Sequence, residues 1–271
     1  MTYFKQSWKR WLAWLLLVVL FAIACSFLSR WQFARRAEVV ARNDIVSSNY
    51  FQPAVPIEQV LKRGKFDPER EWHPVVLIGH YVQGSDLLVR NKPYSGVPGF
   101  LQVAVFQTVD LKLYLVDRGW LPTGQNHDHP DVVPALPSEQ IQVIARIRAA
   151  ETSNGKSAPK GELAAIEPTE AAKQIGAKEP VASSFYLRLA SEKPSKKVAP
   201  KLETMPELSE GNHLSYAIQW IIFAVMAFAT LVWSIRRELD FYRSVNDPNY
   251  VPKPKKLSRA QRDNQAEDEL L

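Results

Sequence analysis

The chain of 271 residues contains a single cysteine, Cys25, which lies inside a long apolar run near the N-terminus. The remainder of the chain therefore cannot form an internal disulfide bond. It also cannot build a site in which several thiolates share a metal ion. A metal or a metal-containing cofactor would need other ligands, and histidine is the leading candidate among them.

The motifs of nucleotide-binding and hydrolytic enzymes are absent as well. Gly79, Gly84, Gly96 and Gly99 are scattered among β-prone runs, and none opens a helix after a strand in the dinucleotide-binding spacing. The sequence has no Gly-x-Ser-x-Gly nucleophile elbow. A membrane-anchored enzyme is therefore the weakest functional interpretation, and we expect no catalytic residues.

Charge is moderately unbalanced, because 34 Lys and Arg residues exceed 28 Asp and Glu residues and give a net charge of +6. The basic residues stand mainly beside two apolar runs and in the C-terminal tail. This distribution is typical of contacts with a membrane surface. We therefore predict the lipid bilayer as a partner and no binding to nucleic acid.

One apolar run lies near each end of the chain, at residues 11–28 and 214–235, and neither contains a charged residue. A helix needs about 20 apolar residues to cross the hydrocarbon core, so both runs are predicted transmembrane helices. A cleaved signal peptide is the alternative for the first run. The bulky Trp11 and Trp14, and the lack of a small-residue cleavage pattern after the run, favour an uncleaved anchor.

The flanks of the second run predict the orientation. Arg236 and Arg237 follow it directly, whereas the preceding flank carries glutamates. The positive-inside rule therefore places the C-terminus, with a polar and partly disordered tail over residues 236–271, in the cytoplasm. Two spans put residues 1–10 there too and leave residues 29–210 outside the cytoplasm. We expect a multi-pass protein of the cell membrane.

The segment between the runs predicts an α+β domain with a mainly antiparallel β-sheet and a few helices. Residues 30–43 lack Gly and Pro, so the first helix should continue beyond the membrane. Between residues 72 and 116, β-prone runs alternate with turn residues, and residues 110–112 form a tight connection typical of antiparallel neighbours. Residues 140–149 alternate apolar and polar side chains, as a half-buried strand does.

The later part of this domain is less regular. Residues 151–178 are rich in small and polar side chains and predict an excursion with at most a short helix around residues 168–175. A strand resumes at residues 183–190. Residues 193–211 are predicted to form a Pro-containing connection to the second apolar run. No functional residues are expected in residues 151–178.

The chain has five histidines: His73, His80, His127, His129 and His213. His127-x-His129 has the spacing of a metal pair, but it lies among turn formers, and a solvated loop is the favoured interpretation. His73 precedes a proline at the start of a predicted strand, and His80 lies within that strand. Both are interpreted as ordinary surface or half-buried residues.

His213 differs from the other histidines by its position at the outer end of the second run. An imidazole at membrane depth is costly unless it is paired or functional. Tyr216 and Gln219 lie near the same side, about one helical turn away. One interpretation is an interfacial helix cap with Asn212 as the N-cap residue, and the other is a ligand to a metal or cofactor. The residues alone leave both open.

Four short pieces of sequence resemble one known family. They are Trp31-Gln32 with Arg35 after the first run, GHY at residues 79–81, LVDRGWLP at residues 115–122, and NHLSYAIQW at residues 212–220. In this order and spacing they resemble the surfeit locus protein 1 family of cytochrome c oxidase assembly factors, over about residues 11–237. The polar tail and the stretch 151–205 depart from the family pattern.

The resemblance implies a chaperone that binds haem a and assists its insertion into the catalytic subunit of the oxidase, with haem a synthase as a further partner. His213 would then be an axial ligand of the haem iron, and Trp220 or Tyr216 would pack against the macrocycle. Arg118 would pair with the haem propionates. A structural ion pair of Arg118 with Asp117 or another acid is the alternative.

Other residues of these motifs receive expectations from the same resemblance. Trp31 and Gln32 would lie at the same membrane surface as His213, in a joint site or in a contact between the two helices. Gly119 is expected at a turn and Trp120 in the core or an interface. A function of another class also fits the sequence: a scaffold that holds oxidase subunits together without touching haem.

Overall fold

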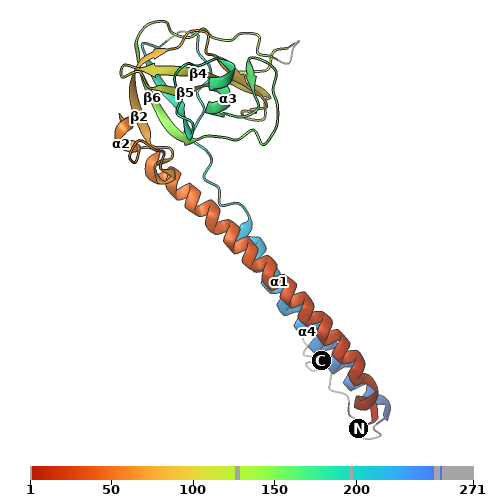
Figure 1. Ribbon diagram of the computed structural model, residues 1–271. Helices are drawn as coiled ribbons and strands as arrows, with labels where there is room; N and C mark the ends of the chain where they lie inside the picture. The colour runs from red at the N-terminus through yellow and green to blue at the C-terminus, as the bar shows by residue number, and fades with distance from the viewer. Residues whose placement is uncertain (1, 126–128, 196–197, 247–250, 252–271) are drawn as a thin grey trace, which may run out of the picture. The chain divides into compact units, whose positions relative to one another are not determined.

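The computed structural model describes residues 2–125, 129–195, 198–246 and 251. The chain divides into two compact units. One unit comprises Met1–Ala37 and Gly211–Leu271 and is built from two long helices. The other comprises Glu38–Glu210 and contains the strands, as Figure 1 shows.

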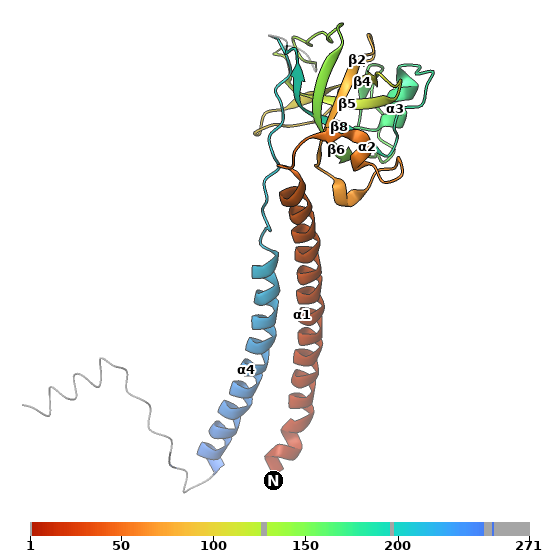
Figure 2. The ribbon, with the colours of Figure 1, turned by 90° about the vertical axis from the view of Figure 1, so that its left-hand side faces the viewer.

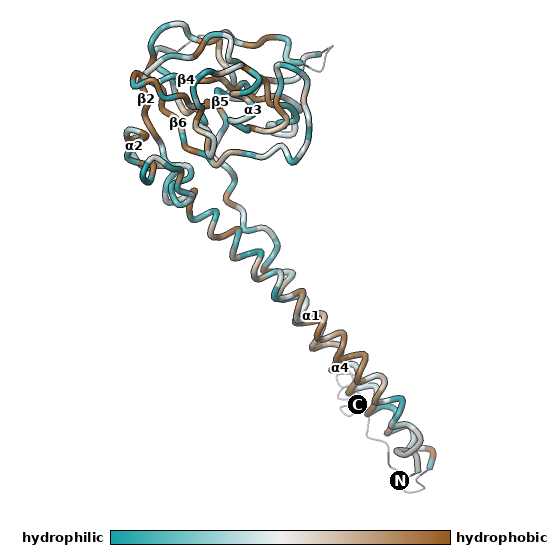
Figure 3. Tube along the Cα trace, in the orientation of Figure 1, coloured by the Kyte–Doolittle hydropathy of each residue, from teal (hydrophilic) through white to brown (hydrophobic). Residues whose placement is uncertain are grey.

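The two long helices are α1, Thr2–Asn49, and α4, His213–Asn246. Both are long and apolar enough to cross a membrane, and Figure 3 shows the hydrophobic stretch of each. Helix α1 continues past the first apolar run, as predicted. Helix α4 extends beyond the predicted end of the second run at residue 235, so the tail begins as helix. The rest of the expected disordered tail, apart from residue 251, lies outside the described residues.

Within their unit the two helices are antiparallel neighbours (Figure 2) and pack through small side chains. Cys25 and Ser29 on α1 and Ala217 on α4 are buried. The Ser29 hydroxyl donates a hydrogen bond of 3.0 Å to the carbonyl oxygen of Ala217. Small residues let helix backbones approach closely, and a hydroxyl contact of this kind is a common interhelical link in membranes. This contact fixes the register of α4 against α1.

The second unit contains the remaining elements. In chain order they are β1 (Val55–Pro56), α2 (Ile57–Val60), a 3-10 helix (Pro68–Arg70), β2 (Pro74–Tyr81), β3 (Leu87–Val89), β4 (Gly99–Thr108), β5 (Leu113–Pro122), β6 (Ile141–Ala149), β7 (Glu162–Leu163), α3 (Pro168–Gln174) and β8 (Phe185–Lys193). The predicted strands and the short helix near residue 168 are confirmed. Strand β6 alternates buried and more exposed residues, as predicted.

Five strands close into a ring in the order β2–β6–β8–β5–β4, because β4 also pairs with β2. Every pairing in this ring is antiparallel except that between β5 and β8. Short β1 and β3 extend the sheet from β2 and β4, and β7 pairs with β3. The predicted mainly antiparallel sheet is confirmed, and its closure removes two of the edges that would otherwise be open to another chain.

Two apolar clusters stabilise this barrel. The first draws on all five ring strands and fills the inside, with Val75, Phe106, Val116, Val143 and Leu187 among its members. The second lies on the other face of β3, β4 and β5 and is covered by β7 and α3. Alternate residues of β5 serve the two clusters, as the period of two in a strand requires.

The structure corrects the expectation that Gly119 lies at a turn. Gly119 is inside β5, and the register against β4 shifts between Gln102 and Val103, which is a β-bulge. Its φ is +130°, and a Cβ there would lie 2.5 Å from the carbonyl oxygen of Lys201. The backbone of Lys201 forms two hydrogen bonds with Trp120, of 2.8 and 2.9 Å. Glycine therefore lets the segment that leads to α4 lie directly on β5.

Two further expectations concern His73 and Trp120. His73 is buried rather than half-buried or exposed, and its Nδ1 lies 2.9 Å from the carbonyl oxygen of Pro74. His80 is exposed on β2, as expected. Trp120 is buried in the second cluster, as predicted, and its indole N–H donates a 2.8 Å hydrogen bond to the carbonyl oxygen of Lys92.

Candidate functional site

The imidazole of His213 is the centre of the candidate site. His213 is the first residue of α4, and its Nδ1 lies 2.9 Å from Oε1 of Gln32 on α1. A carboxamide oxygen can only accept a hydrogen bond, so Nδ1 carries the proton. The lone pair of the neutral ring is then on Nε2, the atom that remains available to a metal.

The backbone around His213 includes a glycine next to the imidazole ring. The N–H of Tyr216 donates a 3.1 Å hydrogen bond to the carbonyl oxygen of Asn212, which closes the first turn of α4. Gly211 has a φ of +64°, and a Cβ at this position would lie 3.7 Å from Nε2 of His213. A larger residue at 211 would therefore be in van der Waals contact with the edge of the ring that carries Nε2. This glycine therefore serves both the backbone turn and access to the imidazole.

Three aromatic residues are close in sequence to one or other member of the His213–Gln32 pair. Trp31, next to Gln32, is 60% exposed, and Tyr216 is 49% exposed. Trp220 is half-buried and packs edge-to-face on Phe223, with ring centroids 5.8 Å apart. The structure thus brings His213 and Gln32 into contact and leaves the rings of Trp31 and Tyr216 exposed.

Arg118 is placed differently from the other candidate residues. It belongs to β5 in the strand-containing unit, and its side chain is fully buried. Its guanidinium contacts Oε1 of Glu192 at 3.2 Å and Oε1 of Gln102 at 3.0 Å, and it lies 5.1 Å from the centre of the Tyr81 ring. Because these partners already occupy the guanidinium, the structure favours the structural ion pair over pairing with haem propionates. The acid is Glu192 on β8, not Asp117.

Asp117 belongs to a second buried charge cluster that sequence reasoning did not identify. Its Oδ2 lies 3.6 Å from Nε of Arg188, and the same Nε lies 3.1 Å from Oε2 of Glu203 in the segment leading to α4. Burial, and after it the charge of Glu203, raise the pKa of the Asp117 carboxyl to about 8 against the opposing effect of Arg188. One arginine therefore faces two carboxyl groups, of which Asp117 is protonated at neutral pH.

The raised pKa of Asp117 predicts that the barrel is less stable at alkaline pH. The folded state binds a proton that the unfolded chain, with an ordinary Asp pKa of 3.8, has released. The free energy of unfolding should therefore fall as the pH rises from about 4 to about 8. Urea unfolding followed by tryptophan fluorescence at several pH values measures this slope. Asp117→Asn should flatten it, whereas the exposed Asp86→Asn should leave it unchanged; equal slopes in all three proteins would contradict the assignment.

The remaining histidines do not form a metal centre within the described part of the chain. No group of three or more His, Cys, Asp or Glu side chains there is placed to hold a metal ion. His127, half of the His-x-His pair, lies outside the described residues. His129 is engaged elsewhere: its Nδ1 lies 2.8 Å from Oε1 of the buried Glu162, and its ring stacks on Phe100.

Two helices that are long and apolar enough to cross a membrane, with a closed β-barrel between them in the chain, are compatible with the class of membrane-anchored β-barrel proteins. Comparison with known proteins gives the family. The model of the SURF1 family matches residues 19–225, so the chain belongs to the SURF1 family. The resemblance seen in the sequence motifs is confirmed.

Individual relatives agree with this assignment. The chain is 29% identical to an uncharacterized SURF1-like protein of Mycobacterium bovis over 232 residues, which cover 80% of each chain. Uncharacterized SURF1-like proteins from two strains of Mycobacterium tuberculosis match with the same identity and coverage. The shared region includes both units rather than one domain.

Proposed function

We propose that this protein is an assembly factor for haem-copper cytochrome c oxidase. Membership of the SURF1 family, which is generally linked to assembly of this oxidase, supports the proposal. The proposed partners are the catalytic subunit of the oxidase and haem a synthase. The protein acts as a chaperone and not as an enzyme, in line with the absence of nucleotide-binding and nucleophile motifs from the sequence.

The cargo in this proposal is haem a, and the observation that carries it is the contact between His213 and Gln32. Axial histidine is a common ligand of haem iron. Metal-binding histidines almost always donate the N–H of their other ring nitrogen to an acceptor, which fixes the ring and makes it more basic. Gln32 supplies that acceptor at 2.9 Å. His213 would hold the iron through Nε2, and the exposed Trp31 and Tyr216 would cover the macrocycle.

The same proposal places the protein in the cell membrane. Helices α1 and α4 would cross the bilayer, both termini would lie in the cytoplasm, and the barrel would lie outside it. The arginines that directly follow the second apolar run support this orientation. His213, at the start of α4, would then lie at the outer membrane surface.

The visible absorption spectrum of the detergent-purified protein, produced in cells that make haem a, tests the cargo. We expect a Soret band and haem a in the extracted pigment. A scaffold that holds oxidase subunits without touching haem is the competing function. It predicts a colourless protein that nevertheless co-purifies with the catalytic subunit, so the two functions give opposite spectra.

The hydrogen bond from His213 to Gln32 predicts the behaviour of Gln32 variants. Gln32→Leu removes the acceptor that orients the ring and should weaken haem a binding by roughly 10- to 100-fold. Gln32→Glu keeps an acceptor at the same position and should retain most of the binding. Titration of the apoprotein with haem a, followed at the Soret band, measures both affinities. Equal binding by Gln32→Leu and the parent would mean that Gln32 serves only helix packing.

A further inference from the structure

The helix pair contains a groove at the start of α1 and the later part of α4, and His213 is not among the residues that line it. Near the start of α4 the small residues Cys25, Ser29 and Ala217 are buried between the helices. Toward the start of α1 large side chains replace them, and a groove of about 560 Å³ lies between the two helices. Figure 2 shows the helices further apart at this end than at the other. The volume is in the range of ligand-binding pockets.

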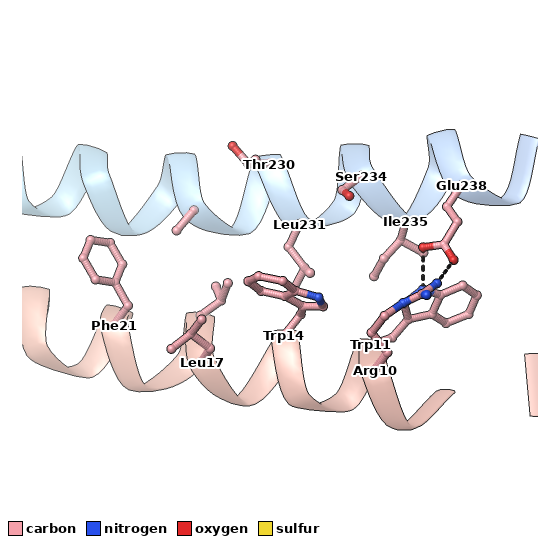
Figure 4. A pocket seen from close by; sticks show the side chains of 12 residues that line it. Arg10, Trp11, Trp14, Leu17, Phe21, Thr230, Leu231, Ser234, Ile235 and Glu238 are labelled. Carbon is pink, nitrogen blue, oxygen red and sulfur yellow. Dashed lines mark hydrogen bonds and ion pairs between the residues drawn. The ribbon is translucent and has the colours of Figure 1, made fainter. Parts of the chain in front are cut away.

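The groove is lined mainly by apolar side chains along its length and by charged side chains at one end, as Figure 4 shows. Its walls are apolar side chains from both helices: Trp14, Leu17 and Phe21 of α1, and Leu231 and Ile235 of α4. At the polar end Arg10 forms an ion pair with Glu238, and the indole N–H of Trp11 donates a 3.0 Å hydrogen bond to the same carboxylate. A molecule that fits this groove has an apolar chain and a polar head.

The net charge around the polar end indicates which kind of lipid head group would bind there. Lys9, Arg10, Arg236 and Arg237 outnumber the acids Glu238 and Asp240 at this end of the two helices. Glu238 already balances Arg10, so the remaining basic residues leave a net positive charge. Basic residues beside a membrane attract anionic lipids by about 1 kcal/mol each. A negatively charged head is therefore favoured over a zwitterionic one.

We propose that this groove binds one anionic phospholipid, with an acyl chain along the apolar walls and the phosphate at the basic end. The proposal requires that the helix pair meet lipid, as the proposed function does, but it does not require haem, the oxidase or a particular orientation. A bound lipid would fill the space that the splayed helices leave between Trp14, Phe21 and Leu231, and would hold the helix ends together.

Native mass spectrometry of the full chain tests this site. The protein in detergent is equilibrated with equal amounts of phosphatidylglycerol and phosphatidylcholine carrying identical acyl chains. We expect one phosphatidylglycerol to be retained at least tenfold more often than phosphatidylcholine. Retention of neither lipid, or of both equally, would overturn the proposal. Because haem is absent from this experiment, its failure leaves the proposed function untouched.

Two variants test separately the apolar walls, where the acyl chain would lie, and the basic end, where the phosphate would lie. Ala227→Phe fills the groove without changing charge and should abolish retention of both lipids. Arg10→Gln leaves the Glu238 carboxylate at the polar end without its cation, so this negative charge should repel the phosphate and remove the preference for phosphatidylglycerol. The exposed Lys173→Gln on α3 makes the same charge change and should keep the preference. Helix content by circular dichroism checks that each variant is folded. Retention by a folded Ala227→Phe equal to that of the parent would place the lipid elsewhere and overturn the assignment.

Discussion

Replacing His213 with alanine is expected to remove the Soret band of protein produced in cells that make haem a. The variant loses the ring nitrogen that would hold the iron, whereas Gln32 and the helix contact between Ser29 and Ala217 remain. Loss of a direct ligand should exceed the roughly 10- to 100-fold effect of losing an outer-shell partner. The measurement is the ratio of Soret to protein absorbance after purification in detergent.

A matched control comes from another histidine of the same chain. His80 is exposed on β2, and His80→Ala should retain the parent spectrum. Added imidazole should partly restore the band in His213→Ala, because it can replace the missing ligand. A His213→Ala protein with the parent spectrum would remove His213 from the haem site, and a colourless parent would favour the scaffold.

Replacing Arg118 with methionine is expected to give the largest loss of stability in the barrel. The side chain is fully buried, and its removal leaves the buried carboxylate of Glu192 without its cation and Oε1 of Gln102 without its donor. Breaking a buried ion pair by removing one member costs about 3–5 kcal/mol. Urea unfolding of the full chain in detergent, monitored by tryptophan fluorescence, measures the change.

The double variant Arg118→Met/Glu192→Leu distinguishes the ion pair from packing. Removing both charges leaves no unpaired carboxylate, so the double variant should be more stable than Arg118→Met alone. Lys173→Met, at an exposed position of α3, serves as a control and should change stability by less than about 0.5 kcal/mol. If Arg118→Met is as stable as this control, the buried pair does not stabilise the barrel.

Much of the fold could be predicted because its signals are local. The apolar runs, the helical continuation through residues 30–43 and the alternating pattern of β6 each depend on neighbouring residues. Closure of the ring could not be predicted, because it depends on three residues of β2 meeting three of β4 and on the parallel pairing of β5 with β8. Pairings between distant segments leave no local pattern of period two or 3.6.

The candidate site shows the same division. Placing Trp31, Gln32 and His213 at the same end of two predicted spans gave the expectation of a joint site or a contact between the helices, and the contact of Gln32 with His213 was seen only in the structure. The partner of Arg118 could not be identified, because Glu192 is 74 residues away on β8. The sequence predicted only a Pro-containing connection around Glu203. In the structure Glu203 forms an ion pair with Arg188, which also lies beside Asp117. The close approach of the Lys201 backbone to Gly119 could not be predicted either, because the two residues are far apart in the sequence.

The segment that follows β8 is held on the barrel over its first part. Hydrogen bonds hold Lys201 on β5, and Met205 packs against Val46, Tyr50 and Trp72. Residues 206–212 then connect this anchored point to His213, and a fully extended chain of that length spans at most roughly 25 Å. The segment is therefore a tether with one end fixed: replacing Gly119, or losing the contacts of Met205, would release chain from the barrel and lengthen the unanchored connection that leads to His213.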